Sequence, residues 1–138
     1  MIAMDRQKKI EQVIVSAQQM RDIEGRIFAS GMPVAALMEK VGRLIVQRIV
    51  ETLQAKPLQR RVGILVGSGH NGGDALVVAR ELHFQGYQVA IYSPFAKYKE
   101  LTASHLHYVE SLGIERYDSV EKLLAESDIL IDGLFGFG

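Results

Sequence analysis

A short apolar run that leads directly into a glycine-rich segment restricts the fold of this chain more than any other feature. The run is VGILVG (62–67), and the segment GSGHNGGDA extends from Gly67 to Ala75. A nearly continuous apolar run of this length is typical of a strand covered on both faces of a sheet. From about Gly73 to Gln85, apolar residues then recur at helical spacing, at Leu76, Ala79 and Leu82. The sequence therefore predicts a strand–turn–helix unit in the middle of the chain.

Strand-like and helical patterns continue to alternate after this unit. YQVAIY (87–92) and DILIDGLFG (128–136) predict strands, and a weaker strand is expected around Arg116–Asp118. One helix is expected from about Lys99 to Leu112, and Ser119 caps another that ends at Glu126. This alternation predicts an α/β fold, with a mostly parallel sheet that carries helices on its faces.

Two helices are expected before the first strand. Ser16 and Gln19 form a capping-box pattern at the start of the first helix, and Gly31 is placed to end it. Pro33 suits the first turn of the second helix, because its missing N–H would be unpaired there in any case. An apolar stripe extends this second helix to about Leu53, through Leu37, Val41, Leu44, Ile45 and Ile49.

Composition limits the size of the protein and the class of its partners. The 138 residues suffice for one domain (1–138) with its own core. Sixteen Lys and Arg balance sixteen Asp and Glu, so neither nucleic acid nor a membrane surface is expected as a partner. The absence of cysteine excludes disulfides and thiolate ligands. No apolar run reaches the ~20 residues that span a bilayer, and no secretory-signal pattern is present, so a cytoplasmic protein is expected.

GSGHNGGDA begins with the pattern G-x-G-x-x-G, which alone is a weak indication of dinucleotide binding. In a strand–turn–helix unit, such glycines let backbone N–H groups approach a phosphate at the helix N-terminus. The full fingerprint also has an acidic residue about 20 positions further on, which binds the ribose. The stretch Ile91–Phe95 contains no carboxylate, and this weakens the hypothesis of an ordinary dehydrogenase.

Two polar residues of the glycine-rich segment have both functional and local explanations. Asn71 offers an amide oxygen as a ligand, and Asp74 can accept hydrogen bonds from hydroxyl groups or bind a hard cation. Alternatively, Asn71 suits a left-handed turn and Asp74 caps the following helix. The residue types alone leave both explanations open.

Asp132 ends the apolar sequence ILID and is the second candidate. A carboxylate buried at the end of such a strand is costly unless it is paired, protonated or bound to a ligand. The alternative is an aspartate that caps the next turn. Because neighbouring parallel strands end at the same sheet edge, Asp132 and Asn71 are expected to lie close together. A cation held by oxygens of these two residues is the more specific hypothesis.

Three linked segments resemble the NAD(P)H-hydrate epimerase family, of the YjeF N-terminal domain type. GSGHNGGDALVVAREL is similar to the family pattern G-x-G-N-N-G-G-D-G-L-V-x-A-R-x-L, and DGLFGFG is similar to D-A-L-F-G-x-G. GMPVAALMEKVG is similar to G-x-P-x-x-x-L-M-E-x-x-G. The chain departs from these patterns by His70 in place of Asn, Ala75 in place of Gly and Gly133 in place of Ala.

The resemblance implies a Rossmann-like three-layer αβα sandwich and an isomerase of nicotinamide cofactor repair. Its substrate is hydrated NADH or NADPH, and the enzyme interconverts the R and S epimers. A partner dehydratase that uses ATP or ADP then regenerates the cofactor. Similar proteins often form homodimers, so a homodimer is expected here too.

Carried over by position, the resemblance implies potassium as the cofactor, with Asn71 and Asp132 as its ligands. The substrate-binding residues that it implies lie in two loops: His70, Asn71, Gly72, Gly73 and Asp74, followed by Gly136, Phe137 and Gly138. A positioned acid would assist departure of the hydroxyl group, and the candidates for this role are Asp74 and Asp132.

The family has a later V-D-I-P-S-G motif, which this chain does not contain. The domain is therefore expected to be incomplete at its C-terminus, and the 138 residues alone are not expected to be active. The alternative is a non-catalytic module on the same scaffold that binds nucleotides, proteins or RNA. The joint presence of Asn71, Asp74 and Asp132 argues against that alternative.

Overall fold

The computed structural model describes residues 14–54 and 61–136 of the chain. Its elements follow the order expected from the sequence: α2 (Ala17–Ala29), α3 (Val34–Leu53), β1 (Arg61–Val66), α4 (His70–Phe84), β2 (Gln88–Tyr92), α5 (Glu100–Ser111), β3 (Glu115–Tyr117), α6 (Val120–Glu126) and β4 (Ile129–Gly133). The chain divides into two compact units, one that holds α2 and ends at Met32 and one from Pro33 to Gly136. No helix of the described ranges is long and apolar enough to cross a membrane.

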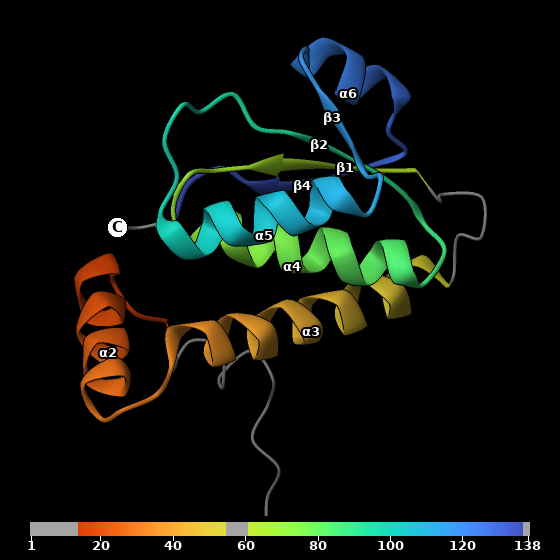
Figure 1. Cartoon of the computed structure of the whole chain (residues 1–138). Helices are drawn as coiled ribbons and strands as arrows, with labels where there is room; N and C mark the ends of the chain where they lie inside the picture. Colours follow the sequence, from red (N-terminus) through yellow and green to blue (C-terminus); the bar gives the residue numbers. More distant parts are fainter. Residues whose placement is uncertain (1–13, 55–60, 137–138) are drawn as a thin grey trace, which may run out of the picture. The chain divides into compact units, whose positions relative to one another are not determined.

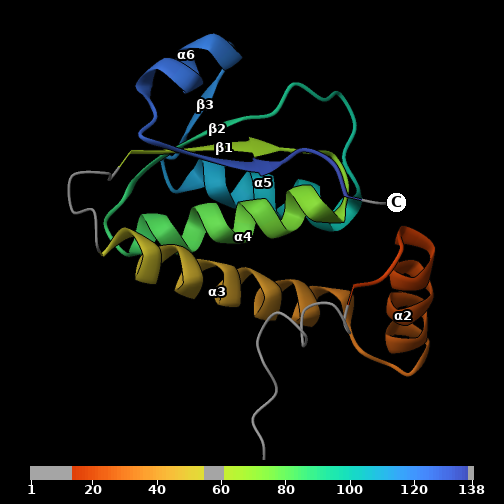
Figure 2. The same ribbon diagram turned by 180° about the vertical axis from the view of Figure 1, so that it is seen from behind.

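The second unit is built on a parallel sheet with the strand order β3-β2-β1-β4. Helices α4 and α5 lie on one face of this sheet, with α3 packed on the outside of α4, and α6 lies on the other face (Figure 1). The view from behind shows the same layers, with β4 along one side of the sheet (Figure 2). The predicted α/β class and parallel sheet are confirmed.

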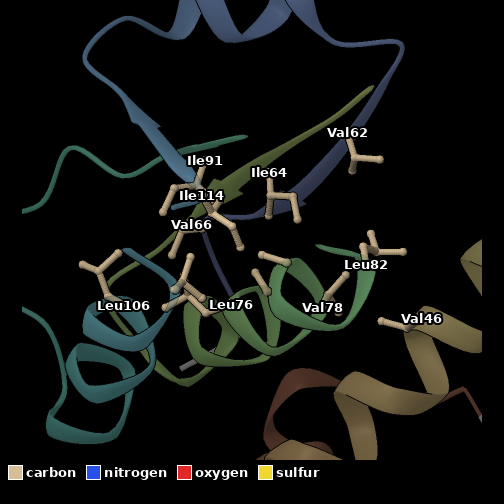
Figure 3. Packing of buried hydrophobic residues seen from close by; sticks show 13 residues of the cluster. Val46, Val62, Ile64, Val66, Leu76, Val78, Leu82, Ile91, Leu106 and Ile114 are labelled. Carbon is tan, nitrogen blue, oxygen red and sulfur yellow. The ribbon is translucent and has the colours of Figure 1, made fainter. Parts of the chain in front are cut away.

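The core lies between the sheet and the helices α4 and α5. Alternate residues of β1 point toward α4, because successive side chains of a strand face opposite sides of the sheet. The residues that meet there are apolar and largely buried, and Figure 3 labels ten of them: Val46, Val62, Ile64, Val66, Leu76, Val78, Leu82, Ile91, Leu106 and Ile114. The carboxyl end of β1 is thereby held rigidly at the point where the glycine-rich segment begins.

The opposite face of β1 is covered by α6. A Cβ atom added to Gly63 would meet the side chains of Leu123 and Ser127. Leu65, on the same face, is only 9% exposed. The prediction that VGILVG is a strand covered on both faces is therefore confirmed.

Side-chain caps set the ends of two helices as the sequence predicts. Ser16 accepts a hydrogen bond from the Gln19 N–H, and the Gln19 side chain accepts one from the Ser16 N–H, which completes a capping box. Gly31 follows this helix with φ of 101°. Ser119 caps α6 through the Lys122 N–H.

The apolar stripe predicted for α3 is only partly its packed face, since Ile49 of that stripe does pack against the core. Leu44 and Ile45 are exposed, whereas α3 buries a row one position away, made of Met38, Gly42 and Val46. Gly42 decides this orientation, because a Cβ there would overlap the Val77 side chain of α4. A residue without a side chain lets the two helices approach closely, and hydropathy alone does not detect that.

Candidate functional site

The glycine-rich segment forms the first turn of α4 rather than a loop before it. The helix begins at His70, three residues before the predicted start, with Gly69 as its N-cap in an extended conformation (φ −95°, ψ −164°). The Gly73 N–H donates to the Gly69 carbonyl oxygen at 3.2 Å and closes the first helical turn. Its N-cap residue, Gly69, has no side chain with which to cap this turn. A helix N-terminus without a side-chain cap presents backbone N–H groups that suit an anion.

Two glycines are required by the close approach of backbone segments. A Cβ on Gly72 would overlap the carbonyl oxygen of Gly67, and a Cβ on Gly67 would overlap the carbonyl oxygen of Leu134. Both obstacles are backbone atoms, which cannot move aside as a flexible side chain can. By contrast, a Cβ on Gly69 would have no neighbour within 4 Å.

The loop after β4 lies directly against the glycine-rich segment. The Gly67 N–H donates to the Gly133 carbonyl oxygen at 2.9 Å. A Cβ on Gly136 would lie 3.5 Å from the Cβ of Asn71. The structure therefore brings two predicted site residues, Asn71 and Gly136, into one place at the carboxyl edge of the sheet.

Asp132 is exposed, so the expectation of a buried carboxylate is wrong. It pairs with Leu65 across the β1–β4 ladder, which puts it on the sheet face opposite α4. Its Oδ1 accepts a hydrogen bond from the Leu134 N–H at 3.0 Å. This is the turn-capping role considered as the alternative, and it leaves the Oδ2 atom for other partners.

The remaining predicted residues are distributed around the same helix start. His70 is exposed, Asn71 and Asp74 are half-buried, and Gly72 and Gly73 are buried. Gly73 is enclosed by Met38 of α3 and Thr102 of α5, because a Cβ there would come within 3.1 Å of both side chains. Phe137 and Gly138 lie outside the described residues.

Ser93 and Thr102 also lie at this site, and the sequence patterns do not predict a role for either residue. Ser93 directly follows β2, where a dehydrogenase would present its ribose-binding carboxylate, but it is only 3% exposed. Its hydroxyl donates to the Val66 carbonyl oxygen at 2.8 Å. Thr102 donates to the Gly69 carbonyl oxygen at 2.7 Å from a position 33 residues away. No local sequence pattern marks such a long-range contact.

An ion pair connects α3 to α4 behind the glycine-rich segment. The guanidinium of Arg80 donates to both carboxylate oxygens of Glu39, at 2.9 and 2.5 Å, and also to Glu81. These hydrogen bonds lower the pKa of Glu39 and raise the pKa of Arg80. Burial lowers the pKa of the nearby His105. The Arg80–Glu39 contact is therefore a bidentate ion pair that links α3 to α4.

A separate cavity of about 530 Å³ opens at the opposite edge of the sheet. It is lined by the amino ends of β1, β2 and β3, with Tyr117 and Glu126 among its residues. The Tyr117 hydroxyl donates to Glu126 at 2.5 Å, and this raises the pKa of Tyr117 to about 12. None of the predicted site residues lines this cavity, so it is distinct from the candidate site.

Within residues 14–54 and 61–136, no group of three or more His, Cys, Asp or Glu side chains could hold a metal ion. The predicted pair, Asn71 and Asp132, would supply amide and carboxylate oxygens, which suit a hard cation.

Comparison with known proteins gives matches over most of the chain. The sequence profile of a protein family described as YjeF-related protein N-terminus matches residues 34–138. The "Bifunctional NAD(P)H-hydrate repair enzyme Nnr" of Synechocystis sp. is 53% identical over 125 residues, which are 91% of this chain and 24% of that protein. The "NAD(P)H-hydrate epimerase" of Limosilactobacillus fermentum is 32% identical over 132 residues, which are 93% of this chain and 61% of that protein.

The crystal structure of yeast ynu0 has a similar fold. It superposes with a TM-score of 0.76 at 24% sequence identity, over 90% of this chain and 57% of the yeast chain. The chain thus spans about a quarter of the bifunctional relative and less than two thirds of the other two proteins.

Proposed function

Because this chain belongs to the family described as YjeF-related protein N-terminus, we propose that it is part of an epimerase of hydrated nicotinamide cofactors. The reaction would interconvert the R and S forms of hydrated NADH and NADPH, as a step of cofactor repair. The names of the relatives, NAD(P)H-hydrate epimerase and NAD(P)H-hydrate repair enzyme, support this proposal.

The observation that carries the proposal is the contact between the two glycine-containing loops. The Gly67 N–H donates to the Gly133 carbonyl, and Gly136 lies beside Asn71. Two segments separated by about sixty residues thus form one edge, with a helix N-terminus that suits a phosphate and polar side chains next to it. Both segments are among those that resemble the epimerase family.

The proposed chemistry uses the ring nitrogen next to the hydrated carbon. When an acid protonates the hydroxyl group on that carbon, the C–O bond breaks, water leaves, and the ring nitrogen stabilises the cation. Water then adds to either face of the ring, and its proton returns to the conjugate base. Asp74, half-buried in the first turns of α4, and Asp132 are the candidate acids among the described residues.

A potassium ion is proposed as the cofactor, with Asn71 and Asp132 as ligands. The donor set fits, because potassium prefers oxygen ligands that replace its hydration shell. Asn71 offers its amide oxygen, and Asp132 retains its Oδ2 atom while Oδ1 accepts from Leu134. When bound, the ion would supply positive charge near the phosphates of the substrate.

We further propose a homodimer in the cytoplasm that works alongside a dehydratase that uses ATP or ADP. The balanced charge of the chain agrees with a small-molecule substrate rather than with nucleic acid. The bifunctional name of the Synechocystis relative agrees with a coupled repair reaction.

The test is an assay of the full-length protein that contains this chain on one pure epimer of hydrated NADH, with and without potassium, against a protein-free blank. Formation of the other epimer above the blank is expected. Asn71→Ala should abolish it, whereas Ser104→Ala, at an exposed position of α5, should not. The absence of conversion by the unmodified full-length protein, with or without potassium, would overturn the proposal.

A further inference from the structure

We propose that the segment from Ser93 to Thr102, which leads from the end of β2 into the first turn of α5, positions the glycine-rich segment for the phosphates of the substrate, with Thr102 as the principal positioning residue. This inference rests on the proposed function for the identity of the ligand. The positioning itself stands on the contacts of the free chain.

The two buried polar side chains of the described residues both point at the same short stretch of backbone. Thr102 is 0% exposed and Ser93 is 3% exposed. Thr102 donates to the carbonyl of Gly69, and Ser93 donates to the carbonyl of Val66. Burial of a hydroxyl is unfavourable unless it is hydrogen-bonded, so each of these contacts is strongly specified.

A main-chain hydrogen bond holds the same stretch of backbone between these two side-chain hydrogen bonds. The Lys99 N–H donates to the Ser68 carbonyl oxygen at 2.9 Å. Three carbonyls of Val66–Gly69 are therefore held by one segment that lies 27 to 33 residues further along the chain.

The positioning segment is itself fixed from behind. The Tyr98 hydroxyl is 2.6 Å from the Ser93 hydroxyl, and Arg116 donates to the Ser93 carbonyl at 2.8 Å. Arg116 also donates to the Tyr98 hydroxyl at 3.2 Å. Contacts of this kind hold a binding group in one conformation before the ligand arrives.

The consequence for binding follows because the C=O and the N–H of one peptide group lie in the same plane and turn together. When hydrogen bonds fix the carbonyls of Ser68 and Gly69, the orientation of the peptide groups that lead into α4 is fixed too. The first turn of α4, whose N-cap Gly69 has no side chain, then keeps its N–H groups aimed at one place. Loss of the Thr102 hydroxyl would leave the Gly69 carbonyl oxygen with the longer hydrogen bond from the Gly73 N–H, at 3.2 Å.

The experiment compares Thr102→Val, which keeps the shape but lacks the hydroxyl, with Thr102→Ser, which restores the donor. Thr52→Val is the matched control. The Thr52 hydroxyl also donates a hydrogen bond to a backbone carbonyl, that of Arg48, but it does so on the exposed side of α3. The two readouts are hydrogen exchange of the backbone amides of residues 67–73 in the free chain and the kinetics with hydrated NADH.

For Thr102→Val, we expect exchange to become about tenfold faster and KM to rise about tenfold, with kcat changed less than about threefold. Thr102→Ser should restore both values to within about twofold, and Thr52→Val should change neither. Unchanged exchange and KM in Thr102→Val would overturn the inference. If the unmodified full-length protein does not epimerise hydrated NADH, the proposed function fails, whereas the exchange rates still decide the role of Thr102.

Discussion

Ala75 of α4 and Gly133 of β4 lie so close together that only one of them has room for a methyl group. A Cβ on Gly133 would overlap the Cβ of Ala75 and would come within 2.9 Å of the Leu65 carbonyl oxygen. The family pattern that this chain resembles has Gly at the first position and Ala at the second. The two departures from that pattern are thus one exchange, in which the single methyl sits on the helix instead of the strand.

This relationship predicts that Gly133→Ala and Ala75→Gly are coupled. Gly133→Ala alone should lower the free energy of unfolding by about 1–3 kcal/mol because it overpacks the contact. Ala75→Gly alone should lower it by about 1–2 kcal/mol through helix propensity and the lost methyl. The double variant should be more stable, by at least about 1 kcal/mol, than the sum of the two single-variant losses predicts, as measured by chemical denaturation. Strict additivity would contradict the contact.

A second pair of variants tests the close approach of the two loops. Gly67→Ala should lower the free energy of unfolding by about 2–4 kcal/mol, because its methyl would collide with the Leu134 carbonyl. Gly69→Ala is the matched control, since its methyl would have no neighbour within 4 Å. Thermal unfolding of both variants gives the comparison. Equal midpoints would mean that the loops are further apart than the structure has them.

Local signals explain which features of this fold were predictable. The side-chain caps involve residues three apart, so Ser16 and Ser119 mark helix starts without tertiary information. The continuous apolar run of β1 likewise predicts a strand with two covered faces. The alternation of elements then leads to the parallel sheet.

The errors all concern contacts between distant elements. Hydropathy predicts that Leu44 and Ile45 belong to the packed stripe of α3. Instead, the close contact of Gly42 with Val77 sets the rotation of α3 about its axis, so that Met38, Gly42 and Val46 are buried. Asp132 was expected to be buried because ILID is apolar, whereas it projects from a strand at the side of the sheet. Thr102 carries no motif, and only the packing of α5 against α4 shows that it contacts Gly69.

A third prediction concerns acid stability and the Glu39–Arg80 pair. The pKa of Glu39 is lowered in the folded state, so the unfolded chain binds a proton at higher pH than the folded chain does. The stabilisation is therefore present above about pH 4.3, the value of an unperturbed Glu, and is lost as pH falls through the lower folded pKa. Glu39→Gln should cost about 1–2 kcal/mol at neutral pH, a value reduced for partial exposure.

The measurement for this prediction is denaturant unfolding of both proteins between pH 7 and pH 3. The difference between Glu39→Gln and the unmodified chain should shrink toward zero at the acid end. Glu51→Gln is the matched control, because the Glu51–Arg48 pair is exposed and its atoms are 3.9 Å apart. A constant difference across the whole range would mean that the carboxylate charge of Glu39 does not stabilise the fold. His105 does not cancel in this comparison, because the charge of Glu39 opposes the burial that lowers the pKa of His105.

The last prediction separates the two roles assigned to Asp132. Asp132→Asn keeps an oxygen that can accept from the Leu134 N–H but removes the negative charge, whereas Asp132→Ala removes both. Asp132→Asn should therefore unfold at the temperature of the unmodified chain, while Asp132→Ala should lose about 1 kcal/mol of stability. If Asp132 is a potassium ligand, both variants should lose potassium stimulation of epimerisation.

The control for this comparison is Asp118→Asn, at an exposed aspartate between β3 and α6. It changes the net charge by the same amount, so any general effect of charge on potassium binding appears in it as well. Stimulation that survives in Asp132→Asn but not in Asp132→Ala would show that the carboxylate charge is dispensable and that an oxygen at this position suffices. Potassium stimulation that survives in both variants would exclude Asp132 as a ligand. The role of Asp132 would then be to cap the turn at Leu134.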